Sequence, residues 1–201
     1  LIADQPVSYT NYNDYTYRVK KKDVQELIKR YIRGLVDSKY VMISGSIPDG
    51  VGFDIYKRLI KIANEKDKMI YLHASGEALK QALAGEPKFV APYFKHTDKI
   101  LDKEVKSLED YLEAGRRLQE AGAQYVLIPF HSSRLIFSQD EAHLISAPDF
   151  NLVNWLGAGE AYNAAFINYI MEHGFDFVEA NKYAGAAALA IAEKRRVYLE
   201  D

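Results

Sequence analysis

The sequence predicts an α/β fold with a mostly parallel sheet and helices on both of its faces. Short apolar runs that are typical of buried strands alternate along the chain with longer segments of helical periodicity. The chain has 201 residues, of which 48% are hydrophobic and 27% charged. This length and balance suit one buried core, and no repeat or linker marks a boundary, so we expect a single domain over 1–201.

The first half of the chain begins with a tyrosine-rich stretch. From 9 to 19, tyrosines alternate with polar residues, which predicts a strand with one buried face. A helix is expected from Asp23, because the apolar residues that follow recur at helical spacing. Further strands are expected at 40–43, 69–72 and 89–90, and further helices over 52–65 and from Glu77.

The second half opens with a capped helix. Ser107 has the side chain of an N-cap and is followed by acidic residues, and Gly122 is placed to end this helix. The remaining elements that we expect are a strand at 125–128, a hairpin with strands at 135–137 and 143–145, a helix that ends near Gly174, and an alanine-rich helix over 178–194.

Charge and composition exclude several classes of function. The net charge of −2 and the absence of cysteine argue against nucleic-acid or membrane partners, disulfides and thiolate metal sites. No apolar run approaches the ~18–20 residues of a spanning helix and no signal peptide is recognised, so we expect a cytoplasmic protein. The chain begins at Leu1 rather than at a methionine, as expected of a fragment or a trimmed product.

The segment 154–160 (NWLGAGE) joins a turn of small residues to a predicted helix start. Backbone N–H groups at a helix start are unpaired and bind anions, phosphate above all. The amides of Gly157, Ala158 and Gly159 would hold a migrating phosphoryl group, and Glu160 would take a proton from the attacking hydroxyl. This arrangement predicts a phosphoryl-transfer site.

Three landmarks, in order and with suitable spacing, resemble those of the ribokinase-like (pfkB-type) carbohydrate kinases. They are 44–48 (SGSIP), 75–79 (SGEAL) and the glycine turn at 154–159. The similarity runs from about residue 19 to the end of the chain, and the 1-phosphofructokinase and tagatose-6-phosphate kinase branch resembles it most. Roughly the first 90–100 residues of the family are absent, a length within the usual range for such units.

The resemblance implies a ribokinase-like three-layer α/β/α core that transfers phosphate from ATP, with Mg2+, to a sugar or sugar-phosphate hydroxyl. It also implies a homodimer in which 1–20 form a lid or edge strand. Glu160 takes the place of the family's catalytic aspartate, and its extra methylene matters because a misplacement of about 1 Å costs roughly 100-fold in rate. The ligand-binding residues so implied are Asn154, His131, Arg134 and Tyr93 for the nucleotide, and Ser44, Gly45 and Ser46 on the substrate side.

Several positions depart from the family pattern. His73 stands at the start of the family's Asp-Thr-Ser-Gly run, and Tyr93 stands at the asparagine of its Lys-Pro-Asn segment. His131 and Arg134 replace glycines that let the backbone approach the nucleotide phosphates. Because glycine has no Cβ to obstruct a ligand, these two side chains should intrude on the site.

Three functions therefore stay open. The chain is a working sugar-phosphate kinase, a non-catalytic relative used for binding or assembly, or a repurposed site on the same fold. In the repurposed site, Arg134 and His131 would hold a phosphorylated ligand, or His73, His131 and Glu160 would hold a metal ion. These residues and Tyr93 are all expected just past strand ends, where they would share one crevice.

Overall fold

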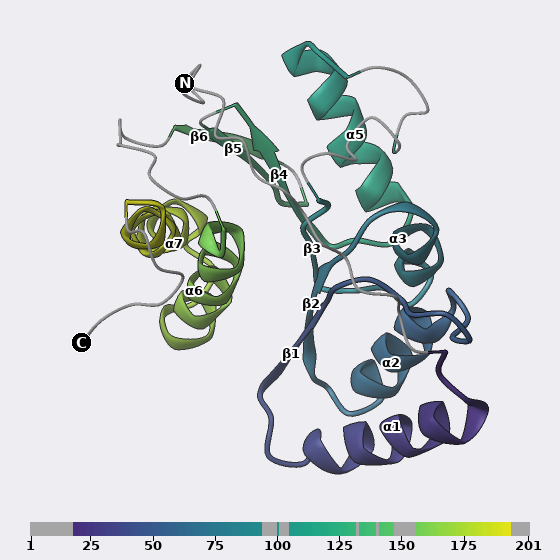
Figure 1. The fold of residues 1–201 in the computed structure, drawn as a ribbon. Helices are drawn as coiled ribbons and strands as arrows, with labels where there is room; N and C mark the ends of the chain where they lie inside the picture. Colours follow the sequence, from purple (N-terminus) through teal and green to yellow (C-terminus); the bar gives the residue numbers. More distant parts are fainter. Residues whose placement is uncertain are drawn as a thin grey trace. The chain divides into compact units, whose positions relative to one another are not determined.

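The computed structural model of the chain describes residues 18–93, 100, 105–131, 133–139, 141–146 and 156–193, which form two compact units (Figure 1). The sheet unit contains the described residues of 18–130 and 135–142. The helical unit contains those of 131–134 and 143–193. Most of the tyrosine-rich strand expected at 9–19, and of the lid or edge strand expected at 1–20, lies outside the described residues.

Six strands form one sheet in the order in which they occur along the chain. Strands β1 to β4 are parallel, with Val41 opposite Ile70, Leu72 opposite Val90, and Val90 opposite Val126. The expected α/β fold with a mostly parallel sheet is therefore confirmed. The strands are Tyr40–Ser44 (β1), Met69–His73 (β2), Phe89–Val90 (β3), Tyr125–Phe130 (β4), Ser133–Phe137 (β5) and Ala142–Ser146 (β6).

The last two strands follow short connections. Only two residues join β4 to its sheet neighbour β5, which leaves room for an antiparallel pair but not for a crossover. The connection from β5 to β6 is closed by the Ser138 N–H, which donates to the Glu141 carbonyl at 2.8 Å. The hairpin that the sequence predicts is present, and each of its strands is longer than expected.

The helices of the sheet unit that fall within the described residues are α1, α2, α3 and α5, and the last three lie on one side of strands β1 to β4 (Figure 1). The Ser107 hydroxyl accepts a hydrogen bond from the Asp110 N–H at 3.2 Å, so the predicted N-cap of α5 is confirmed. Gly122, with a φ of +124°, follows the end of that helix as expected. The helices are Lys21–Gly34 (α1), Ile55–Asn64 (α2), Gly76–Leu83 (α3) and Leu108–Glu120 (α5).

The core of the sheet unit is apolar and includes side chains from strands and from helices. Burial of such side chains is the main force that holds this type of unit together. The buried residues of this core include Ile43, Leu72, Val90, Val126 and Ile128 from the strands and Ile60, Leu79, Leu83 and Leu118 from the helices.

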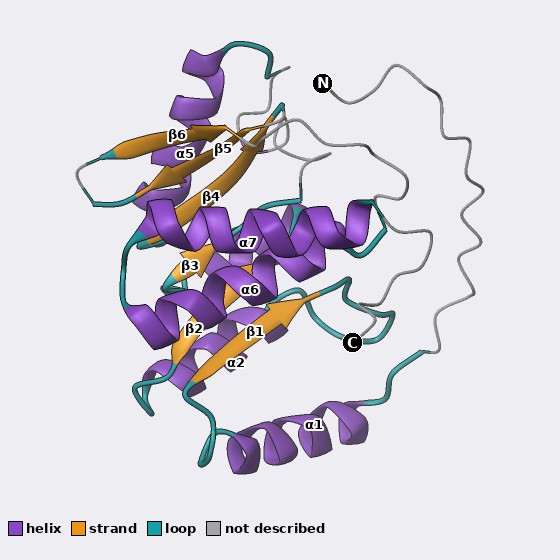
Figure 2. Cartoon of the chain, turned by 90° about the vertical axis from the view of Figure 1, so that its left-hand side faces the viewer, coloured by secondary structure: helices purple, strands orange, loops and turns teal. Residues whose placement is uncertain are grey.

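The helical unit contains α6 (Ala158–His173) and α7 (Phe177–Ala192), which lie side by side (Figure 2). Gly174 ends α6 with a φ of +87°, as its position in the sequence predicts. The buried residues Phe166 and Ile170 of α6 and Ala180 and Ala184 of α7 are small or apolar. Among the described residues, no helix is long and apolar enough to cross a membrane.

Candidate functional site

At the start of α6, in the helical unit, Gly157 and Ala158 are half-buried and Gly159 is exposed. Gly157 precedes the helix in the left-handed conformation, with a φ of +84°, and carries no side chain that could cap the first amides. A Cβ added to Gly159 would meet no described atom within 4 Å, so the backbone there is open to close approach. Glu160 lies exposed in the first helical turn. A left-handed glycine is thus followed by a helix start with a carboxylate in its first turn.

Arg134 lies against α6. Its guanidinium carbon is 3.6 Å from the centroid of the Tyr162 ring. Tyr162 is 4% exposed, and its hydroxyl donates to the Asn181 Oδ1 on α7 at 2.6 Å. Burial raises the pKa of Tyr162 to about 12, while the positive charge of Arg134 acts in the opposite direction. Tyr162 is therefore a neutral hydrogen-bond donor at physiological pH.

The expected place of Arg134 needs a correction. Arg134 lies inside β5 and not just past a strand end, because pairing begins at Ser133, whose hydroxyl lies 3.3 Å from that of Ser146. Serine and arginine carry little strand signal in the sequence, so only the neighbouring strand reveals this start. Glu160 lies in the first turn of α6, and residues 147–155, which precede this turn, lie outside the described residues.

His131 follows the last residue of β4 and is exposed. Its φ of +50° lies in the left-handed region, which residues other than glycine seldom adopt. The resemblance places a glycine at this point of the chain. His131 therefore keeps a backbone conformation suited to glycine while adding an imidazole.

In the sheet unit, His73 and Tyr93 contact each other beyond neighbouring strands. His73 ends β2, and its ring centroid is 4.0 Å from that of Tyr93. His73 Nδ1 lies 2.7 Å from the Ala91 carbonyl oxygen, and because a carbonyl only accepts, Nδ1 carries the proton. The two departures from the family pattern are thus in contact with each other.

The substrate-side residues predicted from the sequence lie at the carboxyl end of β1. Ser44 ends that strand, and Ser44, Gly45 and Ser46 are exposed. The hydroxyl of Tyr56 on α2 donates to the Gly45 carbonyl at 3.1 Å, and burial raises the pKa of this tyrosine. Because β1, β2 and β3 are parallel, these residues share a sheet edge with His73 and Tyr93.

The sequence analysis did not single out Tyr162 and Asn181, which contact each other beside Arg134. A signal was present, because each is a polar residue inside a helix that is otherwise rich in alanine and apolar side chains. It could not show that the two polar atoms meet. Asn154, which the resemblance assigns to the nucleotide, lies outside the described residues.

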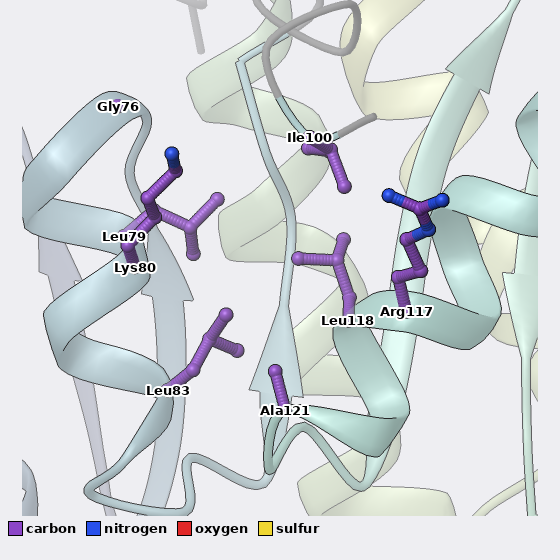
Figure 3. A pocket seen from close by; sticks show the side chains of 8 residues that line it. All are labelled: Gly76, Leu79, Lys80, Leu83, Ile100, Arg117, Leu118 and Ala121. Carbon is purple, nitrogen blue, oxygen red and sulfur yellow. The ribbon is translucent and has the colours of Figure 1, made fainter. Parts of the chain in front are cut away.

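The metal site with His73, His131 and Glu160 stays a prediction, since His73 belongs to the sheet unit and the other two to the helical unit. Within the described ranges, which include His73, His131 and Glu160, no group of three or more histidine, aspartate or glutamate side chains could hold a metal ion. A separate hollow of about 240 Å3 lies between α3 and α5 (Figure 3). It is mainly apolar, with Lys80 and Arg117 among its lining residues, and none of the residues assigned above to ligand binding lines it.

Comparison with known proteins places these features in a family context. Residues 3–199 match the pfkB family carbohydrate kinases. The chain is 27% identical over 171 residues to 1-phosphofructokinase of Borreliella burgdorferi, covering 84% of this chain and 55% of that protein. It is 31% identical over 165 residues to D-tagatose-1-phosphate kinase of Bacillus licheniformis, covering 81% of this chain and 54% of that protein.

A solved structure has the same fold. The crystal structure of a possible 1-phosphofructokinase from Thermotoga maritima superimposes with a TM-score of 0.85 at 27% identity, covering 96% of this chain and 61% of that one. The chain thus spans about half the length of the curated relatives it matches. The expected ribokinase-like fold is confirmed by this likeness.

Proposed function

This chain belongs to the pfkB family of carbohydrate kinases, and from this premise we propose that it takes part in ATP-dependent phosphoryl transfer to a sugar phosphate. The observation that carries the proposal is the start of α6, where a left-handed Gly157 leads into uncapped amides with Glu160 exposed beside them. The names of two relatives, 1-phosphofructokinase and D-tagatose-1-phosphate kinase, support a sugar phosphate as the acceptor.

Each part of this helix start has a role in the proposal. The amides of Gly157, Ala158 and Gly159 hold the transferring phosphoryl group, and Glu160 accepts the proton of the attacking hydroxyl. Phosphoryl transfer needs mainly positioning and electrostatic stabilisation, which fixed backbone amides supply without rearrangement. A general base contributes typically about 100- to 10,000-fold in rate. His131, Arg134, Tyr93 and Asn154 on the nucleotide side, and Ser44, Gly45 and Ser46 on the substrate side, complete the proposed set.

The residues fit the phosphates of a nucleotide better than they fit an isolated metal ion. The open space at Gly159 leaves room for an anion against the backbone. Mg2+ is usually held by one or two carboxylates together with the phosphates, so the absence of a metal-ligand cluster among the described residues is compatible with it. Bound Mg2+ would offset phosphate charge. A homodimer, expected from the resemblance, stays a prediction that sedimentation can check.

A second candidate is a non-catalytic member of the family. This candidate is favoured by packing contacts of the side chains that replace family residues: His73 for aspartate, Tyr93 for asparagine and Arg134 for glycine. His73 packs on Tyr93, and Arg134 packs on Tyr162. In such a protein the fold persists for binding or assembly, while transfer is lost.

Two measurements separate these candidates. We expect ATP with Mg2+ to raise the melting temperature, because a ligand that binds only the folded state stabilises it. ADP release should then be followed with a panel of hexose and ketohexose monophosphates. Glu160→Gln should lower turnover about 100-fold or more, whereas Glu160→Asp should retain or raise it.

The control is Glu172→Gln, which removes an exposed carboxylate at the other end of α6 and should leave turnover unchanged. Equal turnover of wild type and Glu160→Gln would contradict the role of the base. Nucleotide binding without any ADP release would favour the non-catalytic candidate. A chain that binds neither nucleotide nor sugar phosphate would contradict the kinase proposal.

A further inference from the structure

We propose that Arg134 binds a phosphate group of the ligand, and that Tyr162 and Asn181 are positioning residues that hold Arg134 for this task. The inference rests on the proposed function. It gives a role to Arg134, which stands where the family pattern has a glycine. The phosphate can belong to the nucleotide or to the sugar phosphate, because a guanidinium recognises both in the same way.

The guanidinium of Arg134 has no partner for its charge within the described chain. Its guanidinium carbon lies over the Tyr162 ring, and no hydrogen bond or ion pair with another described residue engages its N–H groups. A guanidinium has five N–H donors, which are available to an anion when no acceptor holds them. Arg134 is half-buried, so a bound anion would satisfy donors that water reaches only in part.

Two contacts hold the Tyr162 ring in place, one through its hydroxyl and one through its face. Its hydroxyl donates to Asn181, which is 8% exposed and belongs to the neighbouring helix. Its face is stacked near Phe166, with centroids 5.9 Å apart and planes 17° from parallel. A buried ring held in this way cannot turn without breaking a buried hydrogen bond, which is costly. The ring on which Arg134 lies is therefore fixed in advance of ligand binding.

The direction of the Tyr162 side chain places the cation near the candidate site. Side chains on a helix lean toward its N-terminus and cover the preceding turn. For Tyr162 this is the turn that contains Gly159 and Glu160. Within the described residues, Arg134 forms no ion pair with Glu160, so the two charges are separately available. A phosphate held by Arg134 would thus lie toward the open helix start.

Binding measurements with three ligands test this inference. Dissociation constants for ATP, for a ketohexose monophosphate and for inorganic tripolyphosphate should be measured with the whole chain by calorimetry. Arg134→Gln should weaken the binding of the phosphate ligand that Arg134 contacts by about 10- to 100-fold, as expected for the loss of hydrogen bonds to a charged group. Arg134→Lys should weaken it to a similar degree, because lysine keeps the charge but neither stacks nor presents a planar fork.

Variants of Tyr162 separate positioning from packing. Tyr162→Phe keeps the ring but loses its bond to Asn181, and should weaken binding of the phosphate ligand about two- to tenfold, whereas Tyr162→Leu should match Arg134→Gln. Arg117→Gln is the control, because Arg117 is paired with Glu113 at 2.7 Å in the other unit and should have no effect. Melting without ligand shows whether each variant folds. If Tyr162→Leu does not fold, the affinities of Arg134→Lys, Arg134→Gln and Tyr162→Phe are used to test the inference.

The outcomes distinguish this inference from the proposed function. ATP or sugar-phosphate affinity that is unchanged in Arg134→Gln overturns the inference and leaves the kinase proposal standing. Tripolyphosphate binding that needs Arg134, in a chain that does not bind ATP, supports the inference and contradicts the kinase proposal. Binding of none of the three ligands by the wild type overturns both.

Discussion

The rings of His73 and Tyr93 lie with their centroids 4.0 Å apart and their planes tilted by 42°. The first residue ends β2, and the second lies three residues beyond β3, so the parallel pairing of these strands brings them together. Each replaces a polar residue of the family pattern. Because they contact each other, the two departures are one local change of packing rather than two separate losses.

Tyr162 should make stability fall at alkaline pH. Its pKa is about 12 in the folded chain, because it is buried, against 10.0 for a free tyrosine. Below pH 10 the tyrosine is protonated in both the folded and the unfolded chain, and the free energy of unfolding has its full value. As the pH rises further the unfolded chain loses the proton first, so stability should fall by about 1.4 kcal/mol at about pH 11. Urea unfolding across this range measures the loss.

The matched variant for this pH dependence is Tyr162→Phe, which removes the titrating group. Tyr31, whose pKa burial also raises to about 12, should leave a smaller slope in that variant. Gly185→Ala, which changes no ionisable group, should keep the full wild-type slope. Identical slopes in wild type and Tyr162→Phe would show that the hydroxyl titrates normally.

His131→Gly should stabilise the chain. A residue with a side chain costs about 1–2 kcal/mol in the left-handed region, and glycine costs about 0.5–1 kcal/mol in chain entropy. The φ of His131 is +50°, so we expect a net gain of roughly 0.5–1 kcal/mol in the free energy of unfolding. Lys80→Gly, on the exposed side of α3, should lose about 1 kcal/mol. A loss in both variants would mean that the imidazole contacts outweigh the strain.

Two glycines inside helices should respond in opposite ways to alanine. A Cβ on Gly115 of α5 would overlap the buried ring of Phe137, so Gly115→Ala should destabilise the chain by about 1–3 kcal/mol. A Cβ on Gly185 of α7 would meet no described atom within 4 Å. Gly185→Ala should therefore stabilise by about 0.5–1 kcal/mol through helix propensity. Chemical denaturation measures both, and a stable Gly115→Ala would show that the ring can move aside.

Much of the fold could be predicted because its signals are local. The N-cap at Ser107 and the glycine at 174 depend on a few neighbouring residues, and the structure has helix boundaries at both. The start of β5 could not be predicted, because Ser133 is drawn into the sheet by a partner strand. The expectation of a single domain stays a prediction, as do the roles of Glu160 and the other ligand-binding residues.

The sequence by itself determined the alternation of strands and helices, the family landmarks and the helix start at which Glu160 lies. These follow from periodicity and from residues close together in the chain. Only the tertiary structure decided that Arg134 stacks on Tyr162 and that Tyr162 bonds to Asn181. These residues come from a strand and two helices, and their contacts depend on how those elements pack. Periodicity along one segment carries no information about that packing.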